Sequence, residues 1–347
     1  MTQIDFNEIV REAVQEYDNS KTIVTITDIS AKVSTNHVYR IKFDDNNIII
    51  AKLSYFGKFE HFLEDHSIIN SLANNLPAPF ENFLARSLVK GNSLFVHRHV
   101  DEIIDAWVVF YRPIQIKQRL PKRLNKTQIT KLGASFGRFH RACDSIRNTL
   151  PPSSKTLEVD IKHLLQILET KEGRHEHRMH LDLIREHCHI FLENIEKLEA
   201  NELETIPVFV DWNIGNFSVT SDLELFSRWD YDWFRMSTRM MDFYFFSRIV
   251  SDVGDKTVFS YDVDPLMEER FIRFLKAYHE VYPLKKKEIL LLKEVYRFFL
   301  LNYVVKYGKY FFHEIFASRL QQEAYTKHLP NIDKKFDPAP LLQALNF

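Results

Sequence analysis

The sequence predicts an α+β protein of two lobes: an N-terminal five-stranded antiparallel sheet with one long helix, and a C-terminal lobe that is mostly helical. Between Thr22 and Leu53, β-branched residues alternate with polar ones, whereas helical patterns dominate from Lys126 onward. The chain has 347 residues and 45% hydrophobic content, enough for one large core or two modest ones. We expect the lobes to span residues 1–111 and 112–347.

The elements of the first lobe follow one another closely. An amphipathic helix is predicted over MTQIDFNEIVREAVQEY, then strands at TIVTITDIS, VYRIKF and NIIIAKL, with the turn former DDNN before the last. A helix begins after Phe59, with Phe62, Ile69 and Leu72 on one face, and ends at LPAP because proline cannot continue it. SLFVHRHV and DAWVVFYRPI complete the predicted sheet.

The second lobe contains three long stretches with helical periodicity. They are TQITKLGASFGRFHRAC, residues 156–200 and residues 265–324. A β-rich interruption, IPVFVDWNIGNFSVTSDLELFSRWDYDW, separates the second stretch from the third. This interruption is the segment in which we expect the chemistry.

Charge and composition exclude several classes of partner. Lys plus Arg total 46 and Asp plus Glu total 47, so no overall positive field attracts nucleic acid. The acidic N-terminal segment lacks the basic start and apolar run of a secretory signal, and 298–312 is too short and too charged to span a membrane. Cys143 and Cys188 match no metal or redox spacing. We expect a cytoplasmic protein without a disulfide, and the oligomeric state stays open.

Three polar residues of the β-rich interruption point to phosphoryl transfer. Asp211 and Asn216 are separated by four residues within FVDWNIGNF, and Asp230 follows Asn216 by fourteen residues, at a strand end. Phosphoryl transfer needs a carboxylate aimed at the attacking hydroxyl, oxygen ligands for Mg²⁺ and a cation on the phosphates. Asp211 suits the first role, and Asn216 and Asp230 suit the second.

The cation is available in the first lobe. Lys52 ends the strand NIIIAKL, and the helix that follows carries Glu64 and Asp65. A carboxylate on that helix can pin the lysine toward the phosphates. These residues, in this order, predict an enzyme that transfers the γ-phosphate of ATP or GTP to a hydroxyl group with the help of Mg²⁺.

The motifs resemble those of the aminoglycoside phosphotransferase and choline kinase superfamily, the kinase-like small-molecule phosphotransferases, over nearly the whole chain. That family's catalytic loop reads HGDxxxxN and is followed by a hairpin, an ID pair and a further Asp. Here FVD at 209–211, Asn216, WD at 229–230 and Asp242 keep both spacings. SFGRFHRA around His140 is similar to the family's LAxLH helix, and SIINSLANNLPAP is similar to the helix after the paired acid, which falls on Asp65.

The resemblance implies a protein-kinase-like two-lobed fold and a set of roles. Asp211 would be the base or orienting carboxylate, Asn216 and Asp230 would hold Mg²⁺, and Asp242 would brace the loop. The turn AKVSTNHVYRI has no glycine, but its hydroxyl and backbone groups can still face phosphates. The nucleotide-binding residues that we expect are Ser34, Thr35, Asn36, Lys52, Glu64, Asp65, Phe110 and Arg112.

Two residues of the catalytic loop leave a second function open. Phe209 stands where the family has His and Val210 where it has Gly, so the alternative is a catalytically silent nucleotide-binding or scaffold protein. A protein kinase is disfavoured, because residues 231–241 leave no room for a peptide-docking activation segment. The acceptor stays open among choline, ethanolamine, homoserine, a methylthio-sugar and an antibiotic.

Two further clusters favour structural interpretations. HEHRMHLDLIREHCH holds five histidines, of which His180 and His187 could share a helix face, but no acidic or thiol ligand completes a closed metal site. Aromatic residues between 231 and 246, such as Trp233 and Phe234, favour core packing over a cage for a cationic substrate. His140 is expected to be a packed, hydrogen-bonded core residue.

Overall fold

The first lobe is built on a five-stranded antiparallel sheet, as predicted, with strand order β1-β2-β3-β7-β6. The computed structural model describes residues 4–31, 34–253 and 260–347. Two short strands form a separate hairpin that precedes β6 in the chain. The strands of this lobe are β1 (Ile23–Asp28), β2 (His37–Phe43), β3 (Ile48–Ser54), β4 (Val89–Lys90), β5 (Ser93–Leu94), β6 (Val96–Val100) and β7 (Asp105–Tyr111).

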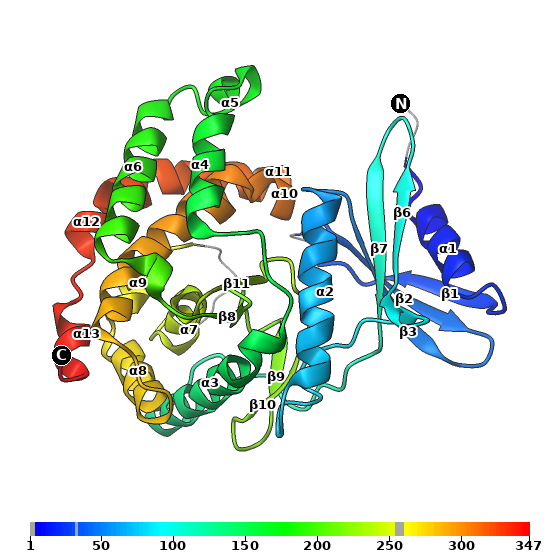
Figure 1. Cartoon of the computed structure of the whole chain (residues 1–347), viewed down its shortest axis with the longest axis horizontal. Helices are drawn as coiled ribbons and strands as arrows, with labels where there is room; N and C mark the ends of the chain where they lie inside the picture. The colour runs from blue at the N-terminus through cyan, green and yellow to red at the C-terminus, as the bar shows by residue number, and fades with distance from the viewer. Residues whose placement is uncertain (1–3, 32–33, 254–259) are drawn as a thin grey trace.

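A helix covers each face of this sheet. Helix α1 (Phe6–Tyr17) lies at the outer edge of the molecule, and α2 (Phe59–Asn75) lies between the sheet and the second lobe (Figure 1). Because successive strand residues point to opposite faces, Val108 and Phe110 join the core under α1, whereas Val109 joins the core of α2 and the second lobe. Ala51 and Leu53 also lie in the α1 core, which sends Lys52 toward the second lobe.

The second lobe is mostly helical. Helix α3 packs closely on α8, and Gly133 permits this approach. A Cβ at Gly133 would lie 2.5 Å from the Phe274 carbonyl oxygen, too close for any other residue without a shift. Helix α9 continues into a π-helical segment, Leu300–Lys306. The helices are α3 (Lys126–Ile146), α4 (Leu157–Ile167), α5 (Lys171–Glu176), α6 (Leu181–Lys197), α7 (Phe243–Val250), α8 (Glu269–Val281), α9 (Lys286–Phe299), α10 (Gly308–Phe311), α11 (Glu314–Glu323), α12 (Ile332–Lys335) and α13 (Ala339–Ala344).

Two short antiparallel strand pairs form the predicted β-rich interruption. Strands β9 (Phe217–Val219) and β10 (Leu225–Arg228) make the hairpin between the two candidate metal ligands. Strands β8 (Thr205–Val208) and β11 (Arg235–Thr238) pair next to it. The loops between these strands therefore meet in one place, at the side of the second lobe that faces α2 (Figure 1).

Two buried clusters form the interior. The smaller lies between α1 and the sheet, and the larger joins α2 to the second lobe. Helix α2 is therefore packed with residues from both sides of the predicted lobe boundary at 111/112. Cys143 and Cys188 are buried and free, as expected.

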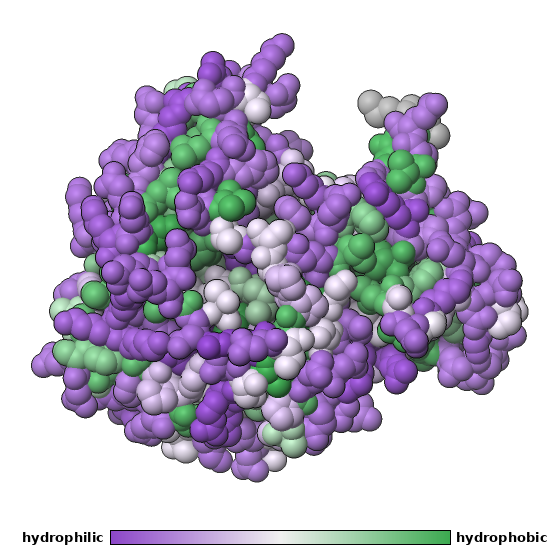
Figure 2. All heavy atoms as spheres, in the orientation of Figure 1, coloured by the Kyte–Doolittle hydropathy of each residue, from purple (hydrophilic) through white to green (hydrophobic). Residues whose placement is uncertain are grey.

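The surface is largely hydrophilic in the view of Figure 2, with a hollow between the second lobe and the β6–β7 hairpin. In the part of the chain that the structure describes, none of the helices combines the length and the apolar character needed to cross a bilayer.

Candidate active site

The loop at residues 209–211 is held from behind by Asp242. Its Oδ1 accepts hydrogen bonds from the backbone N–H groups of Phe209 (2.9 Å) and Val210 (2.6 Å), and its Oδ2 lies 3.0 Å from His140 Nε2. The side chains of Asp242 and His140 are fully buried. Burial lowers the pKa of His140, although Asp242 opposes this shift. Asp242 thus has the position of a loop brace, and His140 is a hydrogen-bonded core residue, as predicted.

Val210 has a left-handed backbone, and Arg228 contacts the residues on either side of it. The φ angle of Val210 is 60°, a left-handed conformation that costs a residue with a Cβ about 1–2 kcal/mol. The Arg228 guanidinium stacks on the Phe209 ring at 4.5 Å from its centroid, and Arg228 Nη2 donates to the carbonyl oxygen of Asp211 at 2.8 Å. Sequence analysis missed this fully buried arginine, whose only signal was a charge inside the strand LELFSRW.

The structure brings Asp211 and Asn216 together. Asn216 Nδ2 donates to Asp211 Oδ2 at 3.0 Å, and the backbone N–H of Asn213 donates to Asp211 Oδ1 at 3.1 Å. The Trp229 N–H donates to the carbonyl oxygen of Asn216 at 3.0 Å. Because Trp229 precedes Asp230, this bond ties the end of the β10 strand to the loop.

Lys52 reaches across from the sheet to the same place. Its Nζ lies 2.9 Å from Asp230 Oδ1 and also pairs with Asp232. The Lys52 side chain is 7% exposed, whereas 39% of the Asp230 side chain remains open to solvent. Sequence analysis missed Asp232, which lies two residues beyond the motif aspartate.

The two carboxylates beside Lys52 have different proton affinities. Burial raises the pKa of Asp230, but Lys52, Arg228 and the hydrogen bond with Asp232 together outweigh burial, so the net pKa falls below the ordinary value. For Asp232, burial prevails over Lys52 and raises the pKa to about 6. Burial lowers the pKa of Lys52, but Asp230 and Asp232 reverse this and raise it overall. Asp230 is therefore ionised at neutral pH beside a charged lysine, and Asp232 takes up a proton first on acidification.

The turn before β2 closes over these charges. Asn36 Nδ2 donates to Asp232 Oδ2 at 2.7 Å. Thr35 Oγ1 instead donates to the carbonyl oxygen of Tyr310, and Ser34 forms a β-bridge with Phe312. Of the three turn residues expected to bind phosphates, Asn36 therefore contacts the charged cluster, while Ser34 and Thr35 contact the second lobe. Residues 32 and 33 of this turn lie outside the described residues.

The predicted pairing of Lys52 with an acid of α2 is wrong. Asp65 Oδ2 accepts from Lys155 Nζ at 2.6 Å, and Glu64 Oε1 accepts from the Ser153 hydroxyl at 2.7 Å. Lys155 lies in the connection between α3 and α4 and competes successfully for Asp65, because Lys52 is already neutralised by the two aspartates after β10. Glu64 and Asp65 thus link α2 to the second lobe, and their role in nucleotide binding stays a prediction.

The Phe110 side chain does not face the charged cluster, and its predicted contact with nucleotide stays a prediction. Its ring stacks on Phe95 at 5.7 Å between centroids, in the core under α1, because it points opposite to Lys52 in the pleated sheet. Its neighbour Tyr111 faces the other way, and its hydroxyl lies 2.6 Å from His66 Nε2. Arg112 is exposed directly after the sheet, and its predicted contact stays a prediction.

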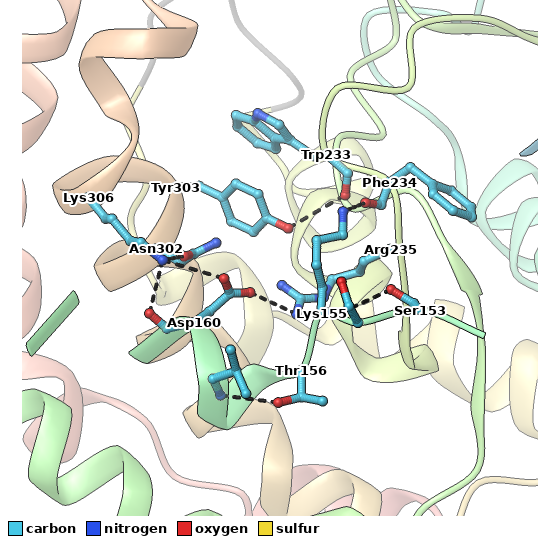
Figure 3. A network of polar contacts seen from close by, with 12 residues as sticks. Ser153, Lys155, Thr156, Asp160, Trp233, Phe234, Arg235, Asn302, Tyr303 and Lys306 are labelled. Carbon is cyan, nitrogen blue, oxygen red and sulfur yellow. Dashed lines mark hydrogen bonds and ion pairs between the residues drawn. The ribbon is translucent and has the colours of Figure 1, made fainter. Parts of the chain in front are cut away.

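A buried polar network follows Asp232 along the chain (Figure 3). Arg235 Nη2 donates to Asp160 Oδ2 at 3.0 Å, and Lys306 Nζ donates to the Asp160 carbonyl oxygen at 3.0 Å. Burial lowers the pKa of Lys306 to about 8, against the effect of Asp160. Lys155 donates to the carbonyl oxygen of Phe234 at 3.0 Å. This network connects α4, β11 and the π-helical segment, and Lys155 links it to α2.

The histidine-rich and aromatic clusters have structural surroundings. The His180 ring stacks on Tyr325 at 4.4 Å between centroids, and His187 contacts Arg297. Trp233 and Phe234 are 5% and 1% exposed. Core packing therefore accounts for these aromatic residues, as expected.

The oxygen donors around Asp211 fit a divalent cation. Carboxylate and amide oxygens are the ligands that Mg²⁺ prefers. Asn216 uses its Nδ2 to bind Asp211, which leaves its Oδ1 for a metal, and Asp230 keeps a partly exposed carboxylate. Asn216 and Asp230 would hold the ion, which would neutralise charge on bound phosphates.

Comparison with known proteins identifies the fold. No protein-family profile and no curated protein matches the chain in sequence. Among solved structures, the chain is similar to an amicoumacin kinase in complex with AMP-PNP, Ca²⁺ and Ami, with a TM-score of 0.64, 14% identity and 97% of each chain covered.

Two further structures have the same architecture. The GDP complex of aminoglycoside 2'-phosphotransferase-IIIa matches with a TM-score of 0.57 and 10% identity, over 96% of this chain and 100% of that one. Macrolide 2'-phosphotransferase type I matches with a TM-score of 0.55 and 10% identity, over 94% of this chain and 100% of that one. The chain therefore has the protein-kinase-like fold of these enzymes over nearly its full length.

Proposed function

We propose that this chain, which has the fold of the small-molecule phosphotransferases, transfers the γ-phosphate of ATP or GTP to a hydroxyl group of a small acceptor. One observation carries the proposal: Lys52 from the sheet meets the oxygens of Asp230, and the adjoining loop holds Asp211 against Asn216. These residues come from distant parts of the chain. Their convergence supplies the cation, the metal ligands and the carboxylate that phosphoryl transfer needs.

Each residue has a distinct role in the proposed step. The acceptor oxygen attacks the γ-phosphorus, the bond to the β,γ-bridging oxygen breaks, and the nucleoside diphosphate leaves with that electron pair. Asp211 orients the attacking hydroxyl and receives its proton. Lys52 turns from Asp230 and Asp232 toward the phosphates, and Asn36 follows as the turn before β2 closes on the nucleotide.

The proposal includes Mg²⁺ at Asn216 and Asp230 and a location in the cytoplasm, where nucleoside triphosphates are available. The acceptor belongs to the class of hydroxyl-bearing metabolites or antibiotics. Amicoumacin, aminoglycosides and macrolides, which the structurally similar enzymes are named for, are the first compounds to screen.

A catalytically silent nucleotide-binding protein is the second candidate. It is favoured by the pairing of Lys52 with two carboxylates, which opposes its turn toward phosphates, and by Phe209 and Val210 in the catalytic loop. In that case the fold and the nucleotide site would persist without turnover.

Thermal-shift and turnover measurements on Asp211→Asn separate these functions. We expect ATP or GTP with Mg²⁺ to raise the melting temperature of wild type and variant alike. We expect acceptor-dependent release of ADP or GDP from the wild type, and a rate about 10²- to 10⁴-fold lower in the variant. Asp222→Asn, an exposed carboxylate in the β9–β10 turn, is the matched control and should be fully active.

Three outcomes are decisive. Nucleotide-induced stabilisation without Asp211-dependent turnover, across a broad panel of hydroxyl compounds, would establish the silent function. Absence of any stabilisation by nucleotide and Mg²⁺ would refute both. Equal turnover in wild type and Asp211→Asn would remove Asp211 from its assigned role.

A further inference from the structure

Two histidines of β6 face the outer helix α1. His97 and His99 alternate with Arg98, so both point to one face of the sheet. Their cross-strand partners on β7, Val108 and Ala106, lie in the core under α1. The histidines therefore lie on the face opposite to Lys52, away from the proposed active site, where α1 packs beside β6 (Figure 1).

Glu12 of α1 reaches between these histidines. Its Oε2 lies 2.8 Å from His99 Nδ1 and 3.9 Å from His97 Nε2. One ligand atom from each residue lies within 4.8 Å of the other two. Of the His, Cys, Asp and Glu side chains that the structure describes, these three form the one group close enough to share a metal ion.

The outer nitrogen of each histidine faces another carboxylate. His97 Nδ1 contacts Glu16, one turn after Glu12 on α1, and His99 Nε2 lies 3.4 Å from Asp101 Oδ2. Metal-bound histidines usually have this arrangement, because a carboxylate that accepts the outer N–H fixes the tautomer with a lone pair on the inner nitrogen. Both histidines are thus oriented with their inner nitrogens toward Glu12.

The buried inner nitrogen of His97 faces Glu12 without a bonding partner among the described residues. When His97 donates its Nδ1–H to Glu16, the lone pair on Nε2 points toward the Glu12 carboxylate, and two electron-rich groups face one another. A positive ion between Nε2 and Oε2 turns this repulsion into two coordinate bonds.

We propose that Glu12, His97 and His99 bind a divalent transition-metal ion, zinc in the first instance. Two imidazole nitrogens and one carboxylate oxygen are a ligand set that suits Zn²⁺ and disfavours Mg²⁺, which prefers oxygen. Three protein ligands leave a fourth position for water. The side chain of Glu12 is 44% exposed, so the ion enters directly from solvent.

The bound ion joins α1 to β6. Helix α1 precedes the sheet in sequence and packs on it through one apolar face, Ile9, Val10, Ala13 and Val14. A metal that binds residues 12, 97 and 99 binds the folded lobe and not the unfolded chain, and so stabilises it by linkage. The site is independent of the phosphotransferase proposal, since it shares no residue with it.

Zinc titration of the full-length protein tests the site. After removal of metal with EDTA, the protein competes for Zn²⁺ with a chromogenic chelator, and Co²⁺ provides a visible absorption spectrum as a second readout. We expect one equivalent of Zn²⁺ in the wild type, and its loss in Glu12→Gln, His97→Gln and His99→Gln. Glu16→Gln should bind about 10- to 100-fold more weakly, because Glu16 only orients His97.

The controls make each outcome decisive. His175→Gln, an exposed histidine on α5, and Asp230→Asn, at the proposed magnesium site, should bind zinc like the wild type. Circular dichroism shows whether each variant is folded, and the Co²⁺ spectrum shows whether nitrogen ligands are lost. The proposal is overturned if the wild type takes up no zinc equivalent, or if the three ligand variants bind as it does. In the latter case His99 forms only an ion pair with Glu12.

Discussion

Val210 offers a direct test of the loop conformation, because its φ of 60° lies in the left-handed region. Val210→Ala removes buried methyl groups from a side chain that is 1% exposed but keeps the Cβ, and so keeps the left-handed penalty of about 1–2 kcal/mol. Val210→Gly removes the Cβ and with it the penalty. Elsewhere glycine costs about 0.5–1 kcal/mol more than alanine through backbone entropy, and the lost Cβ contact adds about 0.8 kcal/mol.

These terms nearly cancel at residue 210. We expect Val210→Gly and Val210→Ala to have the same free energy of unfolding within about 0.8 kcal/mol. Val208, a fully buried residue of β8, is the matched control, because its φ is not positive. There glycine should be less stable than alanine by about 1–2 kcal/mol.

Urea unfolding of the four variants, followed by circular dichroism, measures both differences. At each position, the free energy of unfolding of the alanine variant is subtracted from that of the glycine variant. The loss caused by glycine should be smaller at 210 than at 208 by about 1–2 kcal/mol. Because each pair differs by the same atoms, side-chain burial largely cancels. An equal glycine penalty at both positions would show that Val210 is not left-handed, and the account of the Asp242 brace would fail with it.

Three further changes test the surroundings of the site. Asp242→Ala leaves two buried backbone N–H groups unpaired, so urea unfolding should show a free energy of unfolding lower by about 3–5 kcal/mol. A decrease below about 1 kcal/mol would contradict the role of Asp242 as a brace. Arg228→Met should keep the melting temperature nearly unchanged, because the buried charge is poorly hydrogen-bonded. It should lower kcat about tenfold or more as Asp211 loses a backbone contact; an unchanged kcat would argue against this role. Burial lowers the pKa of His66 to about 3, below its unfolded value, so the unfolded chain binds more protons and stability falls as pH drops below 6.5. From pH 7 to pH 5, His66 lowers the free energy of unfolding by about 2 kcal/mol. In urea unfolding, the stability of His66→Gln should therefore depend less on pH than that of the wild type.

Much of the architecture was determined by local sequence pattern. Alternation of apolar and polar residues defined the five strands, and the 3.6-residue period defined α1 and α2, because these patterns record which face of an element is buried. The resemblance of Asp211, Asn216 and Asp242 to the motifs of a known family implied the loop and its brace. These residues lie within one short segment, 209–242, so their separation along the chain constrains how they can meet.

Only the tertiary structure decided which charges pair. From sequence, Lys52 had an adjacent helix with two acids, yet the fold brings Asp230 and Asp232 to it and gives Asp65 to Lys155. The Glu12, His97 and His99 group joins a helix residue to two strand residues far along the chain, a pairing that no local pattern records. Electrostatic energy depends on the distance between charges in space. That distance is set by how elements pack, and separation along the chain carries no record of it.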